Sequence, residues 1–364
     1  MDQLSGSQKR GDQGAARVWS AAVRWLDIPG PGTTGIVLAA LAVLVVALAA
    51  APDAPAADAR AAWLRAPVVP DLGGRTKQQF LRDVERGRRL KVRSRVFAKV
   101  GDSNTEATPV LYGLACEKAR LAGRHFLSDV IDRYSRIRVA NEDPMAGCRP
   151  WNSFSRRSAA VQSGSFSNWS LRTVSELPNS GYYAAPEQCD PDETPLTCEL
   201  RIMRPRYVFV MTGSNDIRLD YFSGTQPGSQ IGARLGPMIK MIRERGSTPV
   251  LSTIPPIPRG PIGWDGAVKT NEGIWHLARR RHVPLVNLWR ALTGPRMVNF
   301  GIDVGDLHLS VFRETGETPI LSPRPTTYRD SVDFRPEALR YGANRRNLIW
   351  LKTLRKLDRV VRRG

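Results

Sequence analysis

Acidic residues are scarce in this sequence, and features typical of several protein classes are missing from it. Only 34 of the 364 residues are Asp or Glu against 54 Lys and Arg, a formal net charge of +20 at pH 7. The chain has four cysteines, no internal repeat and no low-complexity tract longer than a short Ala-rich run. With 41% hydrophobic residues, it is neither wholly disordered, nor collagen-like, nor a small disulfide scaffold. The chain is therefore able to build a sizeable core.

The cysteines lack the C-x-x-C spacing typical of zinc sites. In an oxidising compartment, an even number of cysteines without that spacing favours disulfides over metal. Cys189 and Cys198 enclose a polar, Pro-containing loop that a bridge could close, which would leave Cys116 to pair with Cys148. Four cysteines allow three connectivities, and the sequence does not choose among them. Four buried free thiols are the alternative.

Only one long hydrophobic run is present, the seventeen uncharged residues 35–51. A polar leader with basic residues precedes it, which predicts a membrane-targeting segment with the N-terminus inside. The run is at the lower limit for crossing about 30 Å of hydrocarbon, and Ala-rich residues 48–57 offer small-x-small cleavage sites. An uncleaved signal anchor is favoured slightly over a cleaved signal peptide. In either case the rest of the chain is expected to be membrane-anchored or secreted and to work outside the cytoplasm.

The remaining chain divides into a linker region and one α/β domain. Residues 52–74 are rich in Ala, Pro and Asp without regular periodicity, and residues 75–95 carry nine basic residues against two acidic ones. After them, short apolar runs alternate with longer amphipathic stretches, which indicates a parallel sheet with helices on both faces. The predicted organisation is a polar cytoplasmic leader (1–34), a signal anchor or signal peptide (35–51), a linker and basic segment (52–92) and an α/β domain (93–364).

Five strands and three long helices are predicted within this domain. Short apolar runs mark the strands, and apolar residues spaced by three and four mark the helices. The strands are expected at residues 96–100, 158–162, 207–211, 248–253 and 283–288, and the helices at 228–245, 270–281 and 336–361.

Polar blocks follow the ends of these strands, at the edge where open α/β sheets bind their ligands. The first strand runs into Gly-Asp-Ser-Asn, where a tight turn would expose Ser103 in the manner that a nucleophile needs. The second strand ends in a Ser-Gly-Ser block around Gly164, and the third in Thr-Gly-Ser-Asn-Asp, which offers the side-chain amide of Asn215. After the fifth strand comes a block that contains His308.

The order and spacing of these four blocks resemble the SGNH or GDSL hydrolases, a superfamily of serine esterases and acyltransferases, over residues 93–364. The resemblance implies a flavodoxin-like three-layer α/β/α sandwich with a five-stranded parallel sheet. It also implies that Ser103 is the nucleophile and His308 the general base. The backbone amides of Ser103 and Gly164 and the side chain of Asn215 would form the oxyanion hole.

The last block departs from the family pattern. The family has Asp three residues before the catalytic His, where this chain has Gly305. The acidic neighbours are Asp306, two residues before His308, and Asp303, five before. A carboxylate normally holds the imidazole in the tautomer that accepts the serine proton. Asp306 is the favoured acid here, with Asp303 and a Ser-His dyad as the alternatives.

Together these observations predict an extracytoplasmic carboxylic ester hydrolase. It would remove an acyl group, such as acetyl, from a carbohydrate or other envelope ester through an acyl-enzyme on Ser103. The alternatives are an O-acyltransferase that acts on a glycan and a catalytically silent binding module. No metal or cofactor is expected.

The net charge of +20 indicates which binding partners the protein would attract. The basic field would suit an anionic glycan, a lipid headgroup or the membrane surface, and a solvated basic surface is the alternative. Nucleic acid is not expected, because no recognised binding module is present.

Overall fold

The computed structural model describes residues 62–106, 110–116, 118–140, 151–177, 188–303, 307–313 and 327–363. Residues 57–364 form one compact unit that contains every residue of the described hydrophobic core, so this fragment has the material to fold by itself. The predicted leader and membrane segment lie outside the described residues. Within the described ranges, no helix combines the length and the apolar character needed to cross a membrane.

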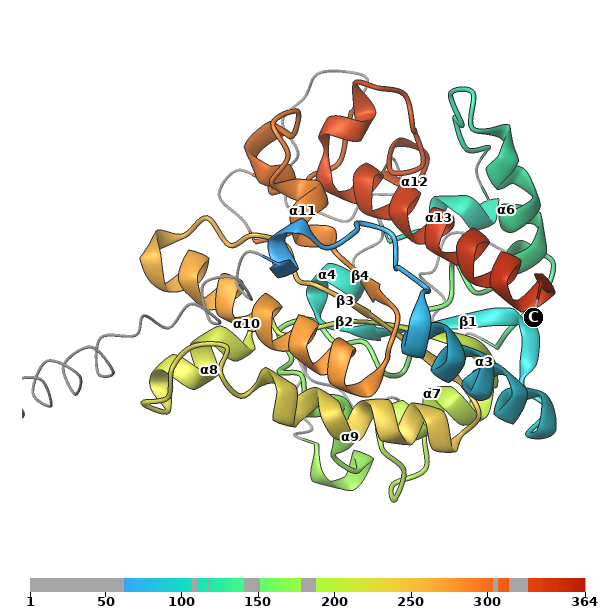
Figure 1. The fold of residues 1–364 in the computed structure, drawn as a ribbon, viewed down its shortest axis with the longest axis horizontal. Coiled ribbons are helices and arrows are strands. Elements are labelled where there is room, and N and C mark those ends of the chain that lie inside the picture. Colours follow the sequence, from blue (N-terminus) through green and yellow to red (C-terminus); the bar gives the residue numbers. More distant parts are fainter. Residues whose placement is uncertain are drawn as a thin grey trace, which may run out of the picture. The chain divides into compact units, whose positions relative to one another are not determined.

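The fold is an α/β fold built on a parallel sheet. In the described part of the chain this sheet has four strands, in the order β1-β2-β3-β4. Figure 1 shows the sheet at the centre, with helices above and below it. The strands are β1 (Arg93–Gly101), β2 (Pro205–Met211), β3 (Thr248–Ser252) and β4 (Leu285–Val286).

The prediction of five strands is not confirmed, because residues 158–162 do not form a strand among the described residues. Val161 makes a single parallel bridge with Gly101, at the outer edge of β1. Two N–H groups that a β-ladder would use form hydrogen bonds with side chains instead. The N–H of Ala159 donates to the Glu199 carboxylate at 3.0 Å, and the N–H of Ala160 donates to the Ser158 hydroxyl at 3.1 Å. The segment thus lies beside β1 at the edge of the sheet but pairs with it through one residue only.

Three long helices agree with the predicted amphipathic stretches. α9 (Ile231–Glu244) matches its prediction closely, and α10 (Gly260–Arg281) begins ten residues earlier than predicted. α13 (Gly342–Arg363) begins six residues later than predicted, and the four leucines of its apolar stripe are all buried. The described α-helices are α3 (Gly74–Arg89), α4 (Ser103–Glu106), α5 (Gly113–Cys116), α6 (Ser128–Ser135), α7 (Pro195–Met203), α8 (Asp216–Phe222), α9 (Ile231–Glu244), α10 (Gly260–Arg281), α11 (Leu288–Leu292), α12 (Thr327–Asp330) and α13 (Gly342–Arg363). Short 3₁₀ turns lie at His125–Leu127, Trp169–Leu171, Val174–Glu176, Val298–Gly301 and Ala338–Arg340.

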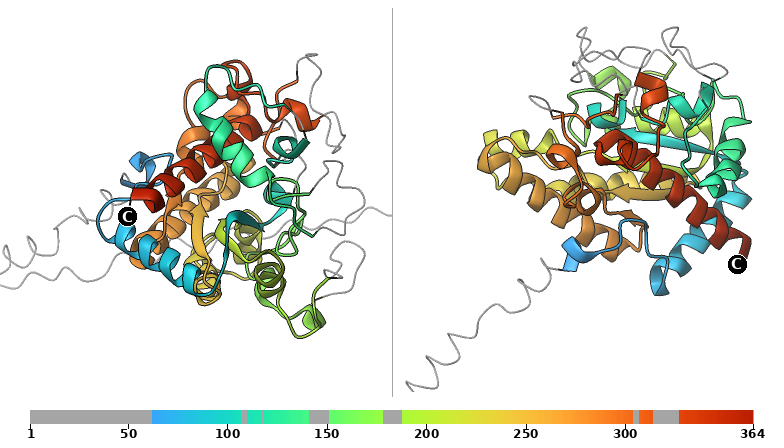
Figure 2. Two further views of the ribbon diagram at one scale, coloured as in Figure 1. Left: turned by 90° about the vertical axis from the view of Figure 1, so that its right-hand side faces the viewer. Right: turned by 90° about the horizontal axis from the view of Figure 1, so that it is seen from above.

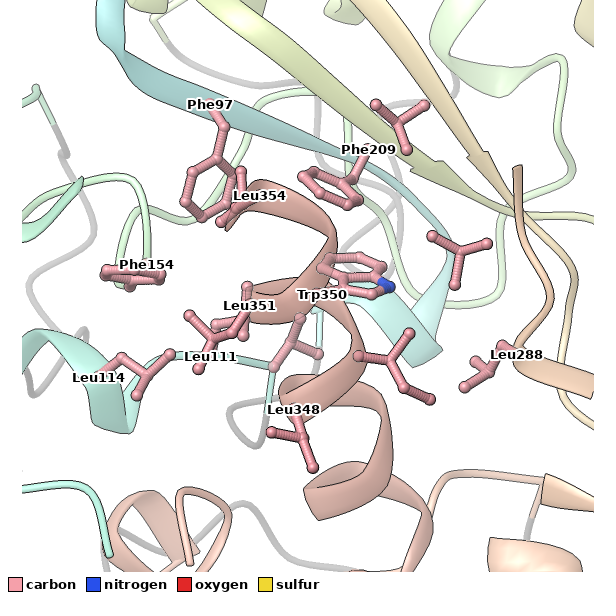
Figure 3. Packing of buried hydrophobic residues seen from close by; sticks show 14 of the residues in the cluster. Phe97, Leu111, Leu114, Phe154, Phe209, Leu288, Leu348, Trp350, Leu351 and Leu354 are labelled. Atoms are coloured by element: carbon pink, nitrogen blue, oxygen red, sulfur yellow. The ribbon is translucent and has the colours of Figure 1, made fainter. Parts of the chain in front are cut away.

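Side chains alternate between two cores, one on each face of the sheet. Phe97 and Phe209 point to the face covered by α13, where Trp350 stacks on Phe209 with ring centroids 4.7 Å apart (Figure 3). Val208 and Val210 point to the opposite face, which α9 and α10 cover. Figure 2 shows these helix layers from two further directions. Because both faces are covered, the inner strands read as nearly continuous apolar runs.

One predicted disulfide is confirmed. Cys189 and Cys198 are bonded, with their Cα atoms 5.4 Å apart, and the bridge closes the polar loop before α7. The other predicted pair, Cys116 with Cys148, lies outside the part of the chain for which side chains are described.

Candidate functional site

The Gly-Asp-Ser block forms a tight turn between β1 and the one-turn helix α4. Gly101 has to be glycine, because a Cβ there would collide with the carbonyl oxygen of Met211 and the side chain of Thr105. The buried Asp102 caps the turn: its Oδ1 accepts the N–H of Asn104 at 3.1 Å. Burial raises the pKa of Asp102 to about 6. The turn holds Ser103 partly exposed at the carboxyl end of β1.

The Ser-Gly-Ser block is fastened to the same strand end. The N–H of Gln162 donates to the carbonyl of Gly101 at 3.1 Å, and the N–H of Gly101 donates to the carbonyl of Ala160 at 3.2 Å. Gly164, two residues after Gln162, has a φ of 72°, a left-handed conformation that favours glycine. The sequence prediction that this block lies beside the Ser103 turn is in accord with these bonds.

The third block is joined to the second by side-chain bonds. Nδ2 of Asn215 donates to the carbonyl of Ser165 at 2.9 Å. The buried Asp216 accepts the N–H of Ser167 at 2.9 Å and its hydroxyl at 2.6 Å, and it also pairs with Arg234 at 2.9 Å. These contacts fix the loop that carries Gly164 against the loop that carries Asn215.

The fourth block forms a short antiparallel hairpin. Ile302 bridges Leu309, and the N–H of Asp303 donates to the carbonyl of His308 at 2.9 Å. Ile302 and Leu309 are buried in the core, so the register puts Asp303 and His308 together on the other face of the hairpin. Asp306, which the sequence favoured as the orienting acid, lies outside the described residues.

Asn104 connects the Ser103 turn to this hairpin, and the sequence analysis missed it. Its buried side chain bonds to the backbone of the residues before and after His308. Nδ2 donates to the carbonyl of Leu307, and Oδ1 accepts a hydrogen bond from the N–H of Leu309, both at 3.2 Å. An amide suits this position because it supplies one donor and one acceptor side by side. Its place next to Ser103 was the only signal in the sequence.

Two buried cations lie close to the turn, and neither was predicted. Arg346 of α13 donates from Nη1 to the carbonyl of Asn104 at 2.7 Å, and its burial lowers its pKa to about 9. Lys99 of β1 donates to the carbonyl of Phe154 at 2.9 Å and lies 4.3 Å from the ring centre of Tyr112. Burial lowers the pKa of Lys99 to about 7. Only the folded packing brings these residues close to the turn, so no pattern in the sequence indicated them.

The four blocks thus converge at the carboxyl edge of the sheet, although they come from distant parts of the chain. A family model for GDSL-like lipases and acylhydrolases matches residues 100–311, which include all four blocks. The chain therefore belongs to the GDSL-like Lipase/Acylhydrolase family, within the SGNH/GDSL hydrolase superfamily. Comparisons with curated proteins and with solved structures gave no significant match. Family membership supports a hydrolase that acts on esters.

The described residues contain no group of three or more His, Cys, Asp or Glu placed to hold a metal ion. The arrangement offers a serine hydroxyl on a tight turn, an imidazole in a hairpin tied to that turn, and amide donors in the neighbouring loops.

Proposed function

We propose that the protein is a serine esterase that hydrolyses an acyl ester through a covalent intermediate on Ser103. The observation that carries the proposal is the pair of bonds from Asn104 to the residues on either side of His308. These bonds tie the backbone of the candidate base to the residue that follows the candidate nucleophile. Such a link suits a pair of residues that exchange a proton during each turnover.

In this mechanism His308 removes the proton of the Ser103 hydroxyl as Oγ attacks the ester carbonyl carbon. The tetrahedral intermediate collapses to an acyl-serine, and the alcohol leaves with the proton that His308 held. A water molecule then attacks the acyl-serine as His308 accepts one of its protons. Collapse of the second intermediate releases the acid and returns the proton to Ser103.

The oxyanion of each intermediate would accept hydrogen bonds from the backbone N–H groups of Ser103 and Gly164 and from the side chain of Asn215. One N–H of the Asn215 amide is used to hold Ser165, and the group carries two. The fixed loops support donors that are in place before the reaction begins. Each donor is expected to contribute about 3 kcal/mol to the stability of the transition state.

Asp303 is the acid that we assign to His308. The hairpin register makes the two residues cross-strand neighbours, and Cβ atoms of such neighbours lie about 5 Å apart, within reach of a carboxylate. A carboxylate there would hold the imidazole tautomer and stabilise the imidazolium that forms. This assignment differs from the sequence preference for Asp306, and the two residues are separated by the variants described below.

The substrate class that we propose is an extracytoplasmic ester of a carbohydrate or another envelope component, with a small acyl group such as acetyl. The uncharged segment 35–51 supports the location, and the disulfide between Cys189 and Cys198 suits an oxidising compartment. An anionic glycan or lipid would suit the net charge of +20.

Covalent labelling tests the nucleophile independently of the natural substrate. The fragment 57–364 is treated with a fluorophosphonate, and the modified peptide is found by mass spectrometry. The proposal expects one adduct on Ser103, abolished in Ser103→Ala and strongly slowed in His308→Ala. Labelling at another serine, or none in a folded fragment, would contradict it.

A further inference from the structure

A groove with strongly basic walls lies between α3 and α9, away from the candidate catalytic site. Its volume is about 480 Å³, within the range of small-molecule sites. The basic residues that line it are Arg82, Arg86 and Arg89 of α3, Lys240 and Arg243 of α9, and Arg281 at the end of α10.

The two walls present cations to each other across the opening. Arg82, Arg86 and Arg89 are spaced by four and three residues, which puts them on one face of α3, and all three are exposed. Lys240 and Arg281 are exposed on the opposite wall. Like charges gathered on both sides of a groove favour an anion between them.

The acidic residues of the lining are already paired within the walls. Oδ2 of Asp83 accepts Nε of Arg243 at 2.9 Å. Glu85 pairs with Arg88 at 3.3 Å and with Arg89 at 3.7 Å, and Glu244 pairs with Lys240 at 3.8 Å. Six basic residues and three acidic ones line the groove, so its opening remains positive overall.

The groove is held in shape by close packing beneath it. Gly87 of α3 lies against the carbonyl of Gly246, where a Cβ would come within 2.5 Å of that oxygen. The ion pair between Asp83 and Arg243 joins the two helices, and Asp83 is only 4% exposed. Gly236 leaves open space in the lining, since a Cβ there would meet no atom within 4 Å. Walls fixed in this way do not have to be ordered when a ligand binds.

The topology separates this groove from the catalytic edge. Its lining residues belong to the helices that lead into the starts of β1, β3 and β4. The Gly-Asp-Ser and Thr-Gly-Ser-Asn-Asp blocks follow the ends of β1 and β2. Because the strands are parallel, the groove lies toward the amino edge of the sheet and the candidate active site at its carboxyl edge.

We infer that the groove binds a multiply charged phosphate group, either free in solution or as part of a lipid headgroup. The arginine side chains suit this ligand, because the planar guanidinium donates two parallel hydrogen bonds to phosphate oxygens. The inference does not depend on the esterase proposal. A ligand held there would fix the enzyme by the end opposite its candidate active site.

The test measures binding of inorganic pyrophosphate to fragment 57–364 by titration calorimetry. The groove variant carries Arg82→Gln, Arg86→Gln and Arg89→Gln. A matched control carries Arg355→Gln, Arg359→Gln and Arg362→Gln, which have the same spacing on α13. Burial and the nearby charges of Arg359 and Arg362 lower the pKa of Arg355, so the control trio is also a cluster of like charges. It forms no part of the groove lining.

The inference expects pyrophosphate to bind the unmodified fragment and to lose at least about tenfold in affinity in the groove variant, the loss typical of one charge-assisted hydrogen bond. The control should change by less than about threefold. A second variant, Lys240→Gln with Arg281→Gln, should also weaken binding if both walls hold the ligand. Equal losses in groove and control variants, or no measurable binding of either pyrophosphate or the phosphatidic acid vesicles described below, would overturn the inference.

Vesicles separate the two sources of phosphate. Sedimentation with phosphatidylcholine vesicles is compared with and without phosphatidic acid. Groove-dependent binding to the phosphatidic acid vesicles supports a lipid headgroup, and groove-dependent binding of pyrophosphate alone supports a soluble phosphate.

Discussion

The N–H of Asp303 donates a hydrogen bond to the carbonyl of His308 at 2.9 Å, which makes these two residues direct neighbours in the hairpin. Asp303, five residues before the histidine, is thereby its cross-strand neighbour in the backbone, although the family pattern has Asp three residues before. The antiparallel register pairs the two arms, so a separation of five residues along the chain does not keep Asp303 from facing His308. A displaced acid is therefore compatible with a working serine-histidine pair.

Replacement of the two acids tests this relationship. Asp303→Asn is expected to lower kcat for a nitrophenyl ester by roughly 10³- to 10⁴-fold, as the amide would favour the wrong imidazole tautomer. Asp306→Asn should stay within about threefold of the unmodified fragment. The reverse result would return the role to Asp306, and normal activity in both variants would leave a Ser-His dyad.

Asn104→Ala tests the link between turn and hairpin. With both bonds to the backbone beside His308 removed, kcat should fall by about 10- to 100-fold while KM changes little, because the variant leaves the donors around the substrate in place. The variant should also lose about 1–3 kcal/mol of unfolding free energy, since buried backbone groups lose their partners. Steady-state kinetics and urea unfolding measure the two effects.

Asn271→Ala provides the matched control. Asn271 is fully buried and makes the same kind of bond pair, to the N–H and the carbonyl of Ile254 at 2.7 and 3.1 Å. The Asn271→Ala variant should therefore lose a similar unfolding free energy but keep a nearly unchanged kcat. Equal losses of kcat in the two variants would mean that Asn104 acts only through general stability.

Two of the site blocks could be predicted from a local signal, because each is a polar stretch directly after a buried strand, β1 or β2. The apolar stripe of α13 was predictable for the same reason, since its leucines recur at helical spacing and all are buried. These two blocks contain Ser103 and Asn215, whereas Gly164 and His308 were predicted from the order of the blocks in the family pattern.

The remaining features depend on pairings that no local pattern encodes. Asn104 bonds to residues about two hundred positions away, and Arg346 comes from the terminal helix. Residues 158–162 read as a strand because they are short and apolar. Side chains of Ser158 and Glu199 take two of the N–H groups that a ladder would use, and this could be seen only in the fold.

The buried Lys99 makes stability depend on pH near neutrality. Its folded pKa of about 7 lies below the usual 10.5, so between these values the unfolded chain binds more protons than the folded one. Stability should therefore rise with pH across this window, by up to about 1.4 kcal/mol per pH unit. Lys99→Met keeps the length of the side chain and removes the titration.

Urea unfolding of both proteins between pH 7 and pH 10 measures the effect. The difference in unfolding free energy between the unmodified fragment and Lys99→Met should shift steadily in favour of the unmodified fragment as the pH rises. A constant difference would mean that Lys99 keeps its ordinary pKa in the folded protein.

The most direct test of the proposed function is hydrolysis of 4-nitrophenyl acetate by fragment 57–364, with Ser103→Ala measured beside it. We expect turnover by the unmodified fragment and its loss in the variant, with thermal unfolding unchanged because Ser103 is partly exposed. Equal turnover by both proteins would contradict the assignment of Ser103. Absence of turnover and of fluorophosphonate labelling in the folded, unmodified fragment would contradict the esterase proposal as a whole.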